Sequence, residues 1–289
     1  MEKLTNCDFE TLHRCPWGGD ETPTEFLYKD FMGCEIVRCQ ECGLVFAKQR
    51  LNKTGLAKYW KDYLSRVHLH DSKAVEQRNK MYEIDFQLIS EHVTKGKVLD
   101  VGCGNGSFLK LFEINGYDAS GVEFGKEAAD TAGNEHKIYY GEFPNLEFKD
   151  KYDLIIFRGV LQYVPDPKAY LEKAIGILAD NGHIFITAQP NMESLCFNLF
   201  KENFTQSVTG VDFIGYTEKL FNEYFKTKGL KKITDKYFYE ETPYANVEED
   251  ILRVAKAIEY KRKNQEITFK APAFYTPHRA HRAAGATAG

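Results

Sequence analysis

The sequence predicts an α/β protein with a doubly wound, mostly parallel sheet, preceded by a small cysteine-rich module and a helical bridge. Buried-strand and amphipathic-helix patterns alternate between residues 95 and 190, which is typical of a parallel sheet with helices on both faces. Five of the seven cysteines lie within the first 50 residues. A run of alternating glycines follows the first predicted strand of the sheet and opens a helix.

Four segments are predicted in order along the chain. Residues 1–50 form the cysteine-rich module, 51–94 a helical bridge or lid, 95–270 the main domain, and 271–289 a disordered or appended tail. Apolar and β-branched runs predict strands at 97–101, 119–123, 138–140, 152–157, 183–188 and 230–239. Apolar residues at helical spacing predict helices at 107–115, 126–134, 168–178, 218–228 and 247–263. His68 and His70 in the bridge could cover a pocket, although a solvated helix end is the favoured interpretation.

Composition narrows the class of protein. The 289 residues carry a net charge of −4 and a sequence pI of about 6.1, so a general nucleic-acid binder is not indicated. The longest apolar runs span only a few residues, whereas a membrane-spanning helix needs about 20. The first residues show no secretory signal pattern. The cysteines are therefore expected to be thiols or metal ligands in the cytoplasm.

The sharpest signal is the segment Asp-Val-Gly-Cys-Gly-Asn-Gly-Ser at residues 100–107. Its glycines permit a tight turn and a close approach of the backbone to a ligand, and the helix that follows offers free N–H groups. The next strand ends in Glu123, whose carboxylate can accept both hydroxyls of a ribose. Because Asp100 would repel a pyrophosphate but attract a cationic amino-acid group, the charges favour S-adenosylmethionine over a dinucleotide.

These residues resemble the first motif of the class I S-adenosylmethionine-dependent methyltransferases. Glu123 matches the ribose-binding acid of that family, and Gly141-Glu142-Phe143 resembles the segment in which an acid faces the adenine amino group. The resemblance implies a Rossmann-like sheet of seven strands, the seventh lying within Glu266 to Tyr275. The donor-binding residues that it implies are Asp100, Gly102, Cys103, Gly104, Gly106, Glu123, Phe124, Glu142, Phe143, Arg158 and Gln162.

The loops after Phe157 and Ala188 should face the methyl group, because ligands of open α/β sheets lie beyond the carboxyl ends of the strands. Tyr163 is the candidate to orient or deprotonate the acceptor, and Arg158 the candidate to pair with an anionic substrate group. Plain packing of Tyr163 and a surface salt bridge of Arg158 are the alternatives. Many relatives carry Glu-His where this chain has Gln162-Tyr163, so catalysis by histidine is in doubt here.

The cysteine-rich module resembles a zinc ribbon. Cys39-Gln-Glu-Cys42-Gly is a turn that presents two thiolates to one tetrahedral Zn²⁺. Cys15-Pro-Trp-Gly18 resembles the other knuckle, but glycine stands where its second cysteine belongs. The predicted ligand set is Cys7, Cys15, Cys39 and Cys42, with His13 and Cys34 as substitutes. A degenerate ribbon that has lost its metal is the other interpretation.

The sequence therefore predicts a cytoplasmic S-adenosylmethionine-dependent methyltransferase with a structural zinc. Similar layouts occur in bacterial methyltransferases of surface-sugar metabolism, so the expected acceptor is a small molecule, a sugar or sugar nucleotide, with O-methylation favoured. An RNA methyltransferase that uses the zinc module for recognition is the second interpretation, which the acidic balance disfavours. A non-catalytic nucleoside-binding or scaffold protein is the third.

Overall fold

The computed structural model describes residues 4–19, 22–61, 72–189, 191–272 and 282–286, the last five by their backbone alone. His68 and His70 lie outside the described residues. The part of the bridge that is described forms two helices, α1 (Lys53–Lys61) and α3 (Ser72–Ser90), in agreement with the helical pattern of the sequence.

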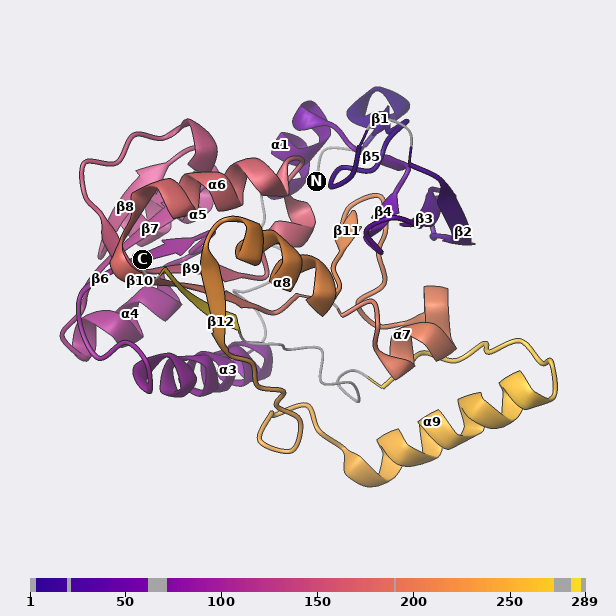
Figure 1. Ribbon diagram of the computed structural model, residues 1–289. Helices are drawn as coiled ribbons and strands as arrows, with labels where there is room; N and C mark the ends of the chain where they lie inside the picture. Colours follow the sequence, from indigo (N-terminus) through magenta and orange to yellow (C-terminus); the bar gives the residue numbers. More distant parts are fainter. Residues whose placement is uncertain (1–3, 20–21, 62–71, 190, 273–281, 287–289) are drawn as a thin grey trace.

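A central sheet dominates the molecule (Figure 1). In spatial order its seven strands are β12 (Leu230–Thr234), β13 (Arg282–Ala286), β10 (Leu178–Thr187), β9 (Tyr152–Arg158), β6 (Lys97–Val101), β7 (Asp118–Glu123) and β8 (Lys137–Tyr140). The five strands from β10 to β8 are parallel, and β13 is antiparallel to both of its neighbours. The parallel core confirms the predicted doubly wound α/β fold.

Helices cover both faces of the sheet (Figure 1). Besides α3 they are α4 (Ser107–Ile114), α5 (Lys126–Gly133), α6 (Pro167–Ile177) and α8 (Glu218–Thr227). Alternate residues of β9 enter different cores, as the pleat of a strand requires. Leu154 and Ile156 pack in a cluster with α3 and α4, whereas Ile155 and Phe157 pack in the cluster that holds α6 and α8. Burial on both faces explains the continuous apolar run of this strand.

A second, smaller sheet joins the cysteine-rich module to the later part of the chain. Its strands in spatial order are β11 (Ile214–Gly215), β4 (Val45–Ala47), β3 (Glu35–Cys39) and β2 (Thr24–Lys29). Beside it, β1 (Phe9–Thr11) pairs with β5 (Gln49–Leu51), preceded by the 3₁₀ turn η1 (Asn6–Asp8). The edge strand β11 pairs antiparallel with β4, so the module shares a sheet with a segment beyond the central strands.

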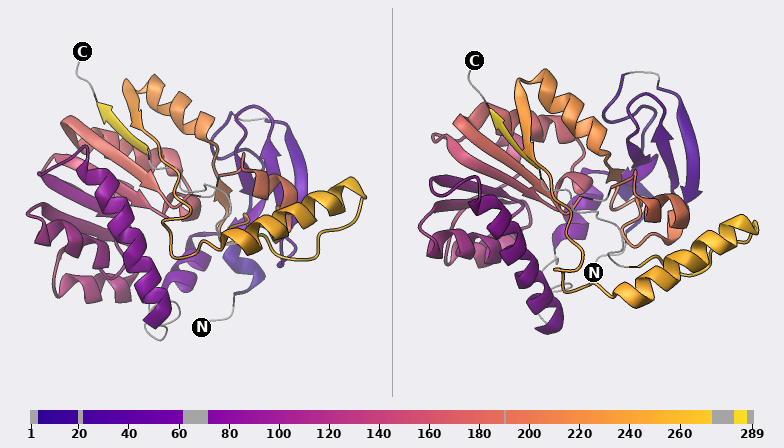
Figure 2. Two further views of the ribbon diagram at one scale, coloured as in Figure 1. Left: turned by 90° about the horizontal axis from the view of Figure 1, so that it is seen from below. Right: turned by 60° about the horizontal axis from the view of Figure 1, so that its bottom comes forward.

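The chain beyond β10 forms α7 (Leu195–Phe200), the 3₁₀ turn η4 (Lys201–Asn203) and α9 (Val247–Arg262). Two further 3₁₀ turns follow strands of the sheet, η2 (Phe143–Asn145) after β8 and η3 (Leu161–Tyr163) after β9. Figure 2 shows α9 lying along the side of the molecule, away from the central sheet. Its buried residues are Asp250, Val254 and Ala257.

The C-terminal segment differs from the prediction in one respect. The seventh strand is formed by Arg282–Ala286, within the segment expected to be disordered, and no strand occurs over residues 266–272. Its backbone inserts between β10 and β12. Alanine and glycine have low β propensity, so the sequence of β13 gave no sign of a strand. Pairing with two neighbouring backbones supplies what propensity lacks.

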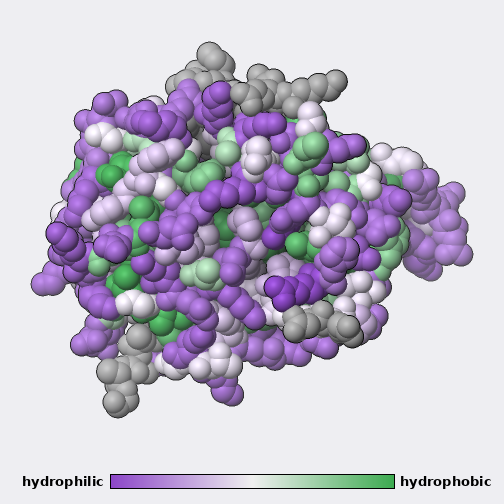
Figure 3. Space-filling view, turned by 90° about the horizontal axis from the view of Figure 1, so that it is seen from above, coloured by the Kyte–Doolittle hydropathy of each residue, from purple (hydrophilic) through white to green (hydrophobic). Residues whose placement is uncertain are grey.

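The surface of the described chain carries both hydrophilic and hydrophobic residues. On the face shown in Figure 3, hydrophilic residues dominate and hydrophobic ones are scattered among them. Within the described residues, no helix combines the length and the apolarity that crossing a bilayer requires. This finding agrees with the absence of long apolar runs in the sequence.

Candidate active site

The turn between β6 and α4 requires glycine at three alternate positions. Gly102, Gly104 and Gly106 have φ angles of +79°, +59° and +82°, a conformation that other residues rarely adopt. Space is also lacking, because a Cβ on Gly102 would lie 2.5 Å from Val160 Cγ2 and one on Gly106 would lie 2.3 Å from His136 Cδ2. The predicted turn thus lies at a strand-to-helix junction and exposes bare backbone.

Glu123 points into this turn from the end of β7. Its Oε2 accepts a hydrogen bond from the Gly104 N–H at 2.9 Å, and its Oε1 accepts one from the Gly125 N–H at 2.7 Å. Burial raises the pKa of Glu123, while these backbone donors act in the opposite direction. The structure therefore brings together the turn and the acid that the sequence predicts as partners.

Asp100 lies at the end of β6, beneath the turn. Its side chain is buried, and its Oδ1 has no hydrogen-bond partner within the described part of the protein. Burial raises the pKa of Asp100 to about 7, against the effect of Arg158 and with a smaller contribution from Glu123. A buried polar atom without a partner is costly in a folded protein. Asp100 is therefore suited to accept a hydrogen bond from a bound ligand, above all a cationic one.

Comparison with known proteins shows the family to which the chain belongs. Residues 74–234, more than half of the chain, match the sequence profile of a family described as a methyltransferase domain. The chain belongs to this family. It is an S-adenosylmethionine-dependent methyltransferase.

Two relatives illustrate the range of similarity. The methyltransferase is 28% identical over 163 residues to the uncharacterized protein MJ1123 of Methanocaldococcus jannaschii, a match that covers 56% of this chain and 77% of the relative. It is 29% identical over 112 residues to a ubiquinone biosynthesis O-methyltransferase of Photobacterium profundum, covering 35% of this chain and 47% of that enzyme. The match therefore spans about half the length of this second relative.

Solved structures share the fold. The magnesium protoporphyrin IX methyltransferase of Synechocystis PCC 6803 with bound SAH has a TM-score of 0.56 and 13% identity, covering 82% of this chain and 100% of that one. A methyltransferase of Thermotoga maritima, described as a possible histamine N-methyltransferase, has a TM-score of 0.55 and 15% identity, covering 81% and 100%. At such identities the likeness shows a common fold and nothing finer.

Arg158 of the methyltransferase lies in a buried ion pair. Its Nε donates to Asp85 Oδ2 at 2.8 Å, and the Asp85 side chain has no exposed surface. The guanidinium carbon lies 4.6 Å from the centre of the Tyr82 ring, also on α3. The sequence predicts that Arg158 pairs with an anionic substrate group. In the structure the anionic partner of Arg158 is an internal residue, Asp85. Asp85 could have been found from the sequence, because it interrupts the apolar stripe of Met81, Ile84 and Leu88.

The ends of β9 and β10 gather polar atoms without partners. Gln162 Oε1, Thr187 Oγ1 and Gln189 Oε1 are all buried and, within the described residues, accept no hydrogen bond. Ala188 between them has a φ of +55°, a strained conformation for a residue with a Cβ. Strain and unpaired polar atoms concentrate where ligands bind. These residues lie beyond the carboxyl ends of β9 and β10, where ligands of open α/β sheets bind, and are therefore candidates for the acceptor side.

Tyr163 on η3 faces two residues from distant segments. Its ring centre lies 4.9 Å from that of Trp60 on α1 in an edge-to-face arrangement, and its hydroxyl donates a hydrogen bond to Asp212. The Trp60 carbonyl oxygen would lie 3.4 Å from a Cβ on Gly125, next to Glu123. Asp212 was not foreseen, although a single acid between Val211 and Phe213, both buried, was a usable signal.

The other residues implied for donor binding divide into two groups. Glu142 is partly exposed, accepts a hydrogen bond from Asn145 Nδ2 at 2.8 Å, and lies 3.5 Å from Lys53 Nζ. Phe124 is partly exposed beside Glu123. Phe143 and Cys103, in contrast, point into the protein core. A Cβ on Gly121 would lie 2.4 Å from the Cys103 sulfur, so Cys103 and Phe143 contribute to the site through packing.

Three of the four predicted metal ligands lie together. The Sγ atoms of Cys15, Cys39 and Cys42 are all within 4.8 Å of one another, and those of Cys15 and Cys42 are 3.6 Å apart. Cys7 is exposed in η1 and is not part of this group. Its backbone carbonyl accepts a hydrogen bond from Asn52 Nδ2 at 2.8 Å, which holds η1 beside β5. Cys7 is thus corrected as a member of the ligand set.

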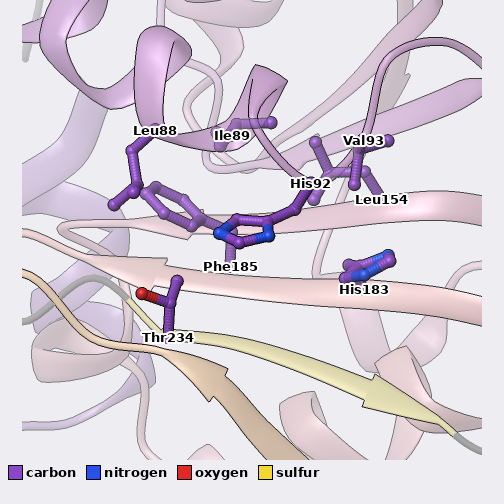
Figure 4. Close-up of a pocket in the computed structure, with 8 residues that line it drawn as sticks. All are labelled: Leu88, Ile89, His92, Val93, Leu154, His183, Phe185 and Thr234. Atoms are coloured by element: carbon purple, nitrogen blue, oxygen red, sulfur yellow. The ribbon is translucent and has the colours of Figure 1, made fainter.

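A small cavity lies away from these sites, between the end of α3 and the strands β9 and β10 (Figure 4). It is lined by Leu88, Ile89, His92, Val93, Leu154, His183, Phe185 and Thr234. His183 pairs with Leu154, near the amino end of β9. Because ligands of this fold lie beyond the carboxyl ends of the strands, the cavity is not the donor site. Its lining is apolar apart from the two imidazoles and Thr234.

Proposed function

We propose that Asp100 and Glu123 hold S-adenosylmethionine and that the enzyme methylates a hydroxyl oxygen of a small molecule, a sugar or a sugar nucleotide. The observation that carries the proposal is the unpartnered Asp100 Oδ1 beneath the glycine turn. A cationic ammonium group supplies the donor that this buried carboxylate lacks. A pyrophosphate site is the usual alternative for a glycine turn, but the negative charges of the buried Asp100 and the half-buried Glu123 would repel a pyrophosphate.

The proposed contacts to the ribose follow from the lone pairs that remain available on the Glu123 carboxylate. Each Glu123 oxygen accepts one backbone N–H, and a carboxylate oxygen can accept more than one hydrogen bond. Glu123 is therefore proposed to take the ribose hydroxyls. Phe124 and Glu142, both partly exposed near the end of their strands, are proposed to flank the adenine.

On the acceptor side, Tyr163 and Asp212 are proposed to move the proton. Bound S-adenosylmethionine supplies an activated methyl group, so the protein needs only to align the acceptor oxygen and remove its hydrogen. The Tyr163 oxygen would accept the hydrogen of the acceptor hydroxyl while its own hydrogen passes to Asp212. Burial raises the pKa of Asp212, which makes its carboxylate a better base than an exposed one.

The acceptor class rests on the unpartnered polar atoms that follow β9 and β10. Gln162, Thr187 and Gln189 offer neutral acceptor oxygens that suit hydroxyl groups, and Arg158 is already paired with Asp85. A hydroxyl-rich and uncharged head group therefore fits better than a carboxylate. The similarity to ubiquinone biosynthesis O-methyltransferases supports oxygen as the methylated atom.

We further propose that Cys15, Cys39 and Cys42 hold a structural zinc. A tetrahedral site with Zn–S bonds of 2.3 Å has sulfur–sulfur edges of about 3.8 Å, close to the 3.6 Å between Cys15 and Cys42. Two backbone N–H groups point at these sulfurs, from Trp17 to Cys15 and from Cys42 to Cys39. The seven cysteines form no disulfide, in keeping with the cytoplasm as the proposed compartment.

Calorimetry with S-adenosylmethionine and S-adenosylhomocysteine tests the donor site. The wild-type protein is expected to bind both, and Asp100→Ala is expected to bind neither. Equal binding by the two proteins would sink the donor assignment. Formation of S-adenosylhomocysteine in the presence of a panel of sugar nucleotides then tests the acceptor; turnover of phenols but not of any sugar nucleotide would contradict the sugar part alone.

A metal analysis tests the zinc site independently of activity. About one zinc per chain is expected in the wild type and in Cys7→Ser, whereas Cys39→Ser is expected to lose it. Retention of zinc by Cys39→Ser would contradict the assignment.

A further inference from the structure

Helix α9 presents an apolar face that the described part of the chain does not cover. Among the residues whose side chains are described, eleven large hydrophobic ones are exposed, and four of these lie on this one helix, Val247, Ile251, Leu252 and Ile258. Leu252 is 71% exposed. Figures 1 and 2 show that the helix stands at the side of the molecule, with α7 as its neighbour. Elsewhere the exposed hydrophobic residues are spread over many elements, so α9 is the place where an interaction surface is indicated.

The charges of α9 are separated along its length. Its first turn carries Glu248, Glu249 and Asp250, and its last turn carries Lys261 and Arg262. Four charges are neutralised in two ion pairs within the helix region, because Arg253 pairs with Glu249 and Lys263 with Glu259. For Glu248 and Arg262, no ion pair is recorded within the described residues. The helix therefore has an acidic end, an apolar middle and a basic end.

This pattern is self-complementary when the helix is reversed. Residues 248, 251, 255, 258 and 262 are three or four positions apart and so share one side of the helix. Leu252 borders this side on one edge, and the buried residues of α9 border it on the other. Ala255 lies at the centre, with Glu248 seven residues before it and Arg262 seven residues after it. In an antiparallel pair centred on Ala255, Glu248 meets the partner's Arg262 and Leu252 meets the partner's Ile258. The small central side chain allows the two backbones to approach closely.

We propose that α9 pairs with α9 of a second copy of this chain, antiparallel about a twofold axis, and that the enzyme is a dimer through this helix. A twofold interface uses the same surface patch on both subunits, and the reversed charge order of α9 meets that requirement. Lipid binding explains the face less well, because an interfacial helix carries cations along its polar side. The acidic first turn would be repelled by anionic headgroups.

Sedimentation analysis of the full chain tests the pairing. The wild type is expected to dimerise in the micromolar range, and Leu252→Glu and Glu248→Arg are each expected to weaken dimerisation at least tenfold. The double variant Glu248→Arg with Arg262→Glu is expected to restore it, because both ends of both helices are then exchanged. Phe31→Glu is the matched control, because Phe31 is also a highly exposed apolar residue (83%) but lies in the cysteine-rich module and not on α9. This variant should leave the dimer intact.

Circular dichroism melting shows whether each variant folds, and binding of S-adenosylhomocysteine should be unchanged in all of them, which separates this proposal from the proposed function. A monomeric wild type overturns the proposal, as does a dimer that Leu252→Glu leaves intact. Failure of the double variant to restore dimerisation overturns the antiparallel register. Co-sedimentation of a monomeric wild type with phosphatidylserine vesicles would assign the face to a membrane instead.

Discussion

The proposed donor side and the proposed acceptor side of the site are built in different ways. The main residues proposed to bind the donor lie on one continuous segment, in which Asp100, the glycine turn and Glu123 follow one another through β6, α4 and β7. The proposed acceptor side takes Trp60 from α1, Tyr163 from η3 and Asp212 from the residues before β11. Local backbone geometry determines the first, and only the tertiary fold brings the second together.

This difference shows which parts of a site depend on which forces. Hydrogen bonds from the Gly104 and Gly125 N–H groups hold Glu123 in place within the single β6–α4–β7 unit. The position of Tyr163 depends instead on the smaller sheet, because Tyr216 next to β11 donates a hydrogen bond from its hydroxyl to the Leu161 carbonyl at 2.7 Å. Substitutions in the cysteine-rich module are therefore expected to disturb the position of Tyr163 more than the position of Glu123.

The largest effect is expected from the ion pair beneath both sides. Asp85→Ala leaves the Arg158 guanidinium buried without its carboxylate, which costs about 3–5 kcal/mol of unfolding free energy in comparable pairs. Urea unfolding measures this loss. The double variant Asp85→Leu with Arg158→Met removes both charges and is expected to recover most of it; no recovery would show that the pair acts other than by charge.

The next largest effect is expected on the acceptor side. Tyr163→Phe removes the hydroxyl that donates to Asp212, and loss of a general base lowers turnover by about a hundredfold or more. Donor binding should not change, because Tyr163 lies outside the continuous segment. Steady-state kinetics measure turnover, and calorimetry measures donor binding. Asp212→Asn should lower turnover comparably, and the double variant should be no worse than either single one, whereas additive losses would separate the two residues.

On the donor side, Asp100→Asn is expected to weaken binding of S-adenosylhomocysteine by about ten- to hundredfold, the range for a hydrogen bond to a charged group. Turnover at saturating donor should change less than affinity. Calorimetry gives the affinity, and Glu142→Gln serves as a comparison, because its partly exposed carboxylate is expected to contribute only a few-fold to donor affinity. An unchanged affinity would place the ligand elsewhere in the fold.

Asp100 also predicts a pH dependence of stability. Its folded pKa is raised to about 7 by burial, so the folded protein retains a proton that the unfolded chain has lost. Its stabilising contribution is complete below the unfolded pKa and disappears as the pH rises toward 7. Relative to Asp100→Asn, the ligand-free wild type should therefore be less stable at pH 8 than at pH 5. Parallel stability curves for the two proteins would contradict this.

The smallest effect is expected at the rim of the donor side. Lys53 and Glu142 form an exposed pair at 3.5 Å, and such pairs contribute less than about 1 kcal/mol. Glu142→Ala should leave unfolding unchanged within that limit and lower donor affinity only a few-fold. A much larger loss of affinity would make the adenine contact as important as Asp100 and would blur the contrast between the two sides.

What the sequence could predict follows the same division. The strands of the parallel core and the helices between them were predicted within a few residues. Each strand is a run of apolar residues, and each helix has apolar residues at helical spacing, so both can be recognised locally. The turn and Glu123 were predicted as partners because one strand-to-helix spacing joins them. Asp212 and the Arg158–Asp85 pair were not predicted, since no local spacing connects residues so far apart. Strand β13 was missed because its pairing depends on neighbouring backbones and not on its alanine and glycine side chains.

Strand β11 has a consequence for anyone who wishes to divide or recombine this protein. Two residues, Ile214 and Gly215, complete a sheet whose other strands all lie before residue 50. Cutting the chain after the module would strip β11 of its hydrogen-bonded neighbour and expose Phe213 and Tyr216, both now buried. A graft of a foreign module onto this catalytic part must therefore carry a matching edge for β11, so evolution and engineering alike have to exchange the two pieces together.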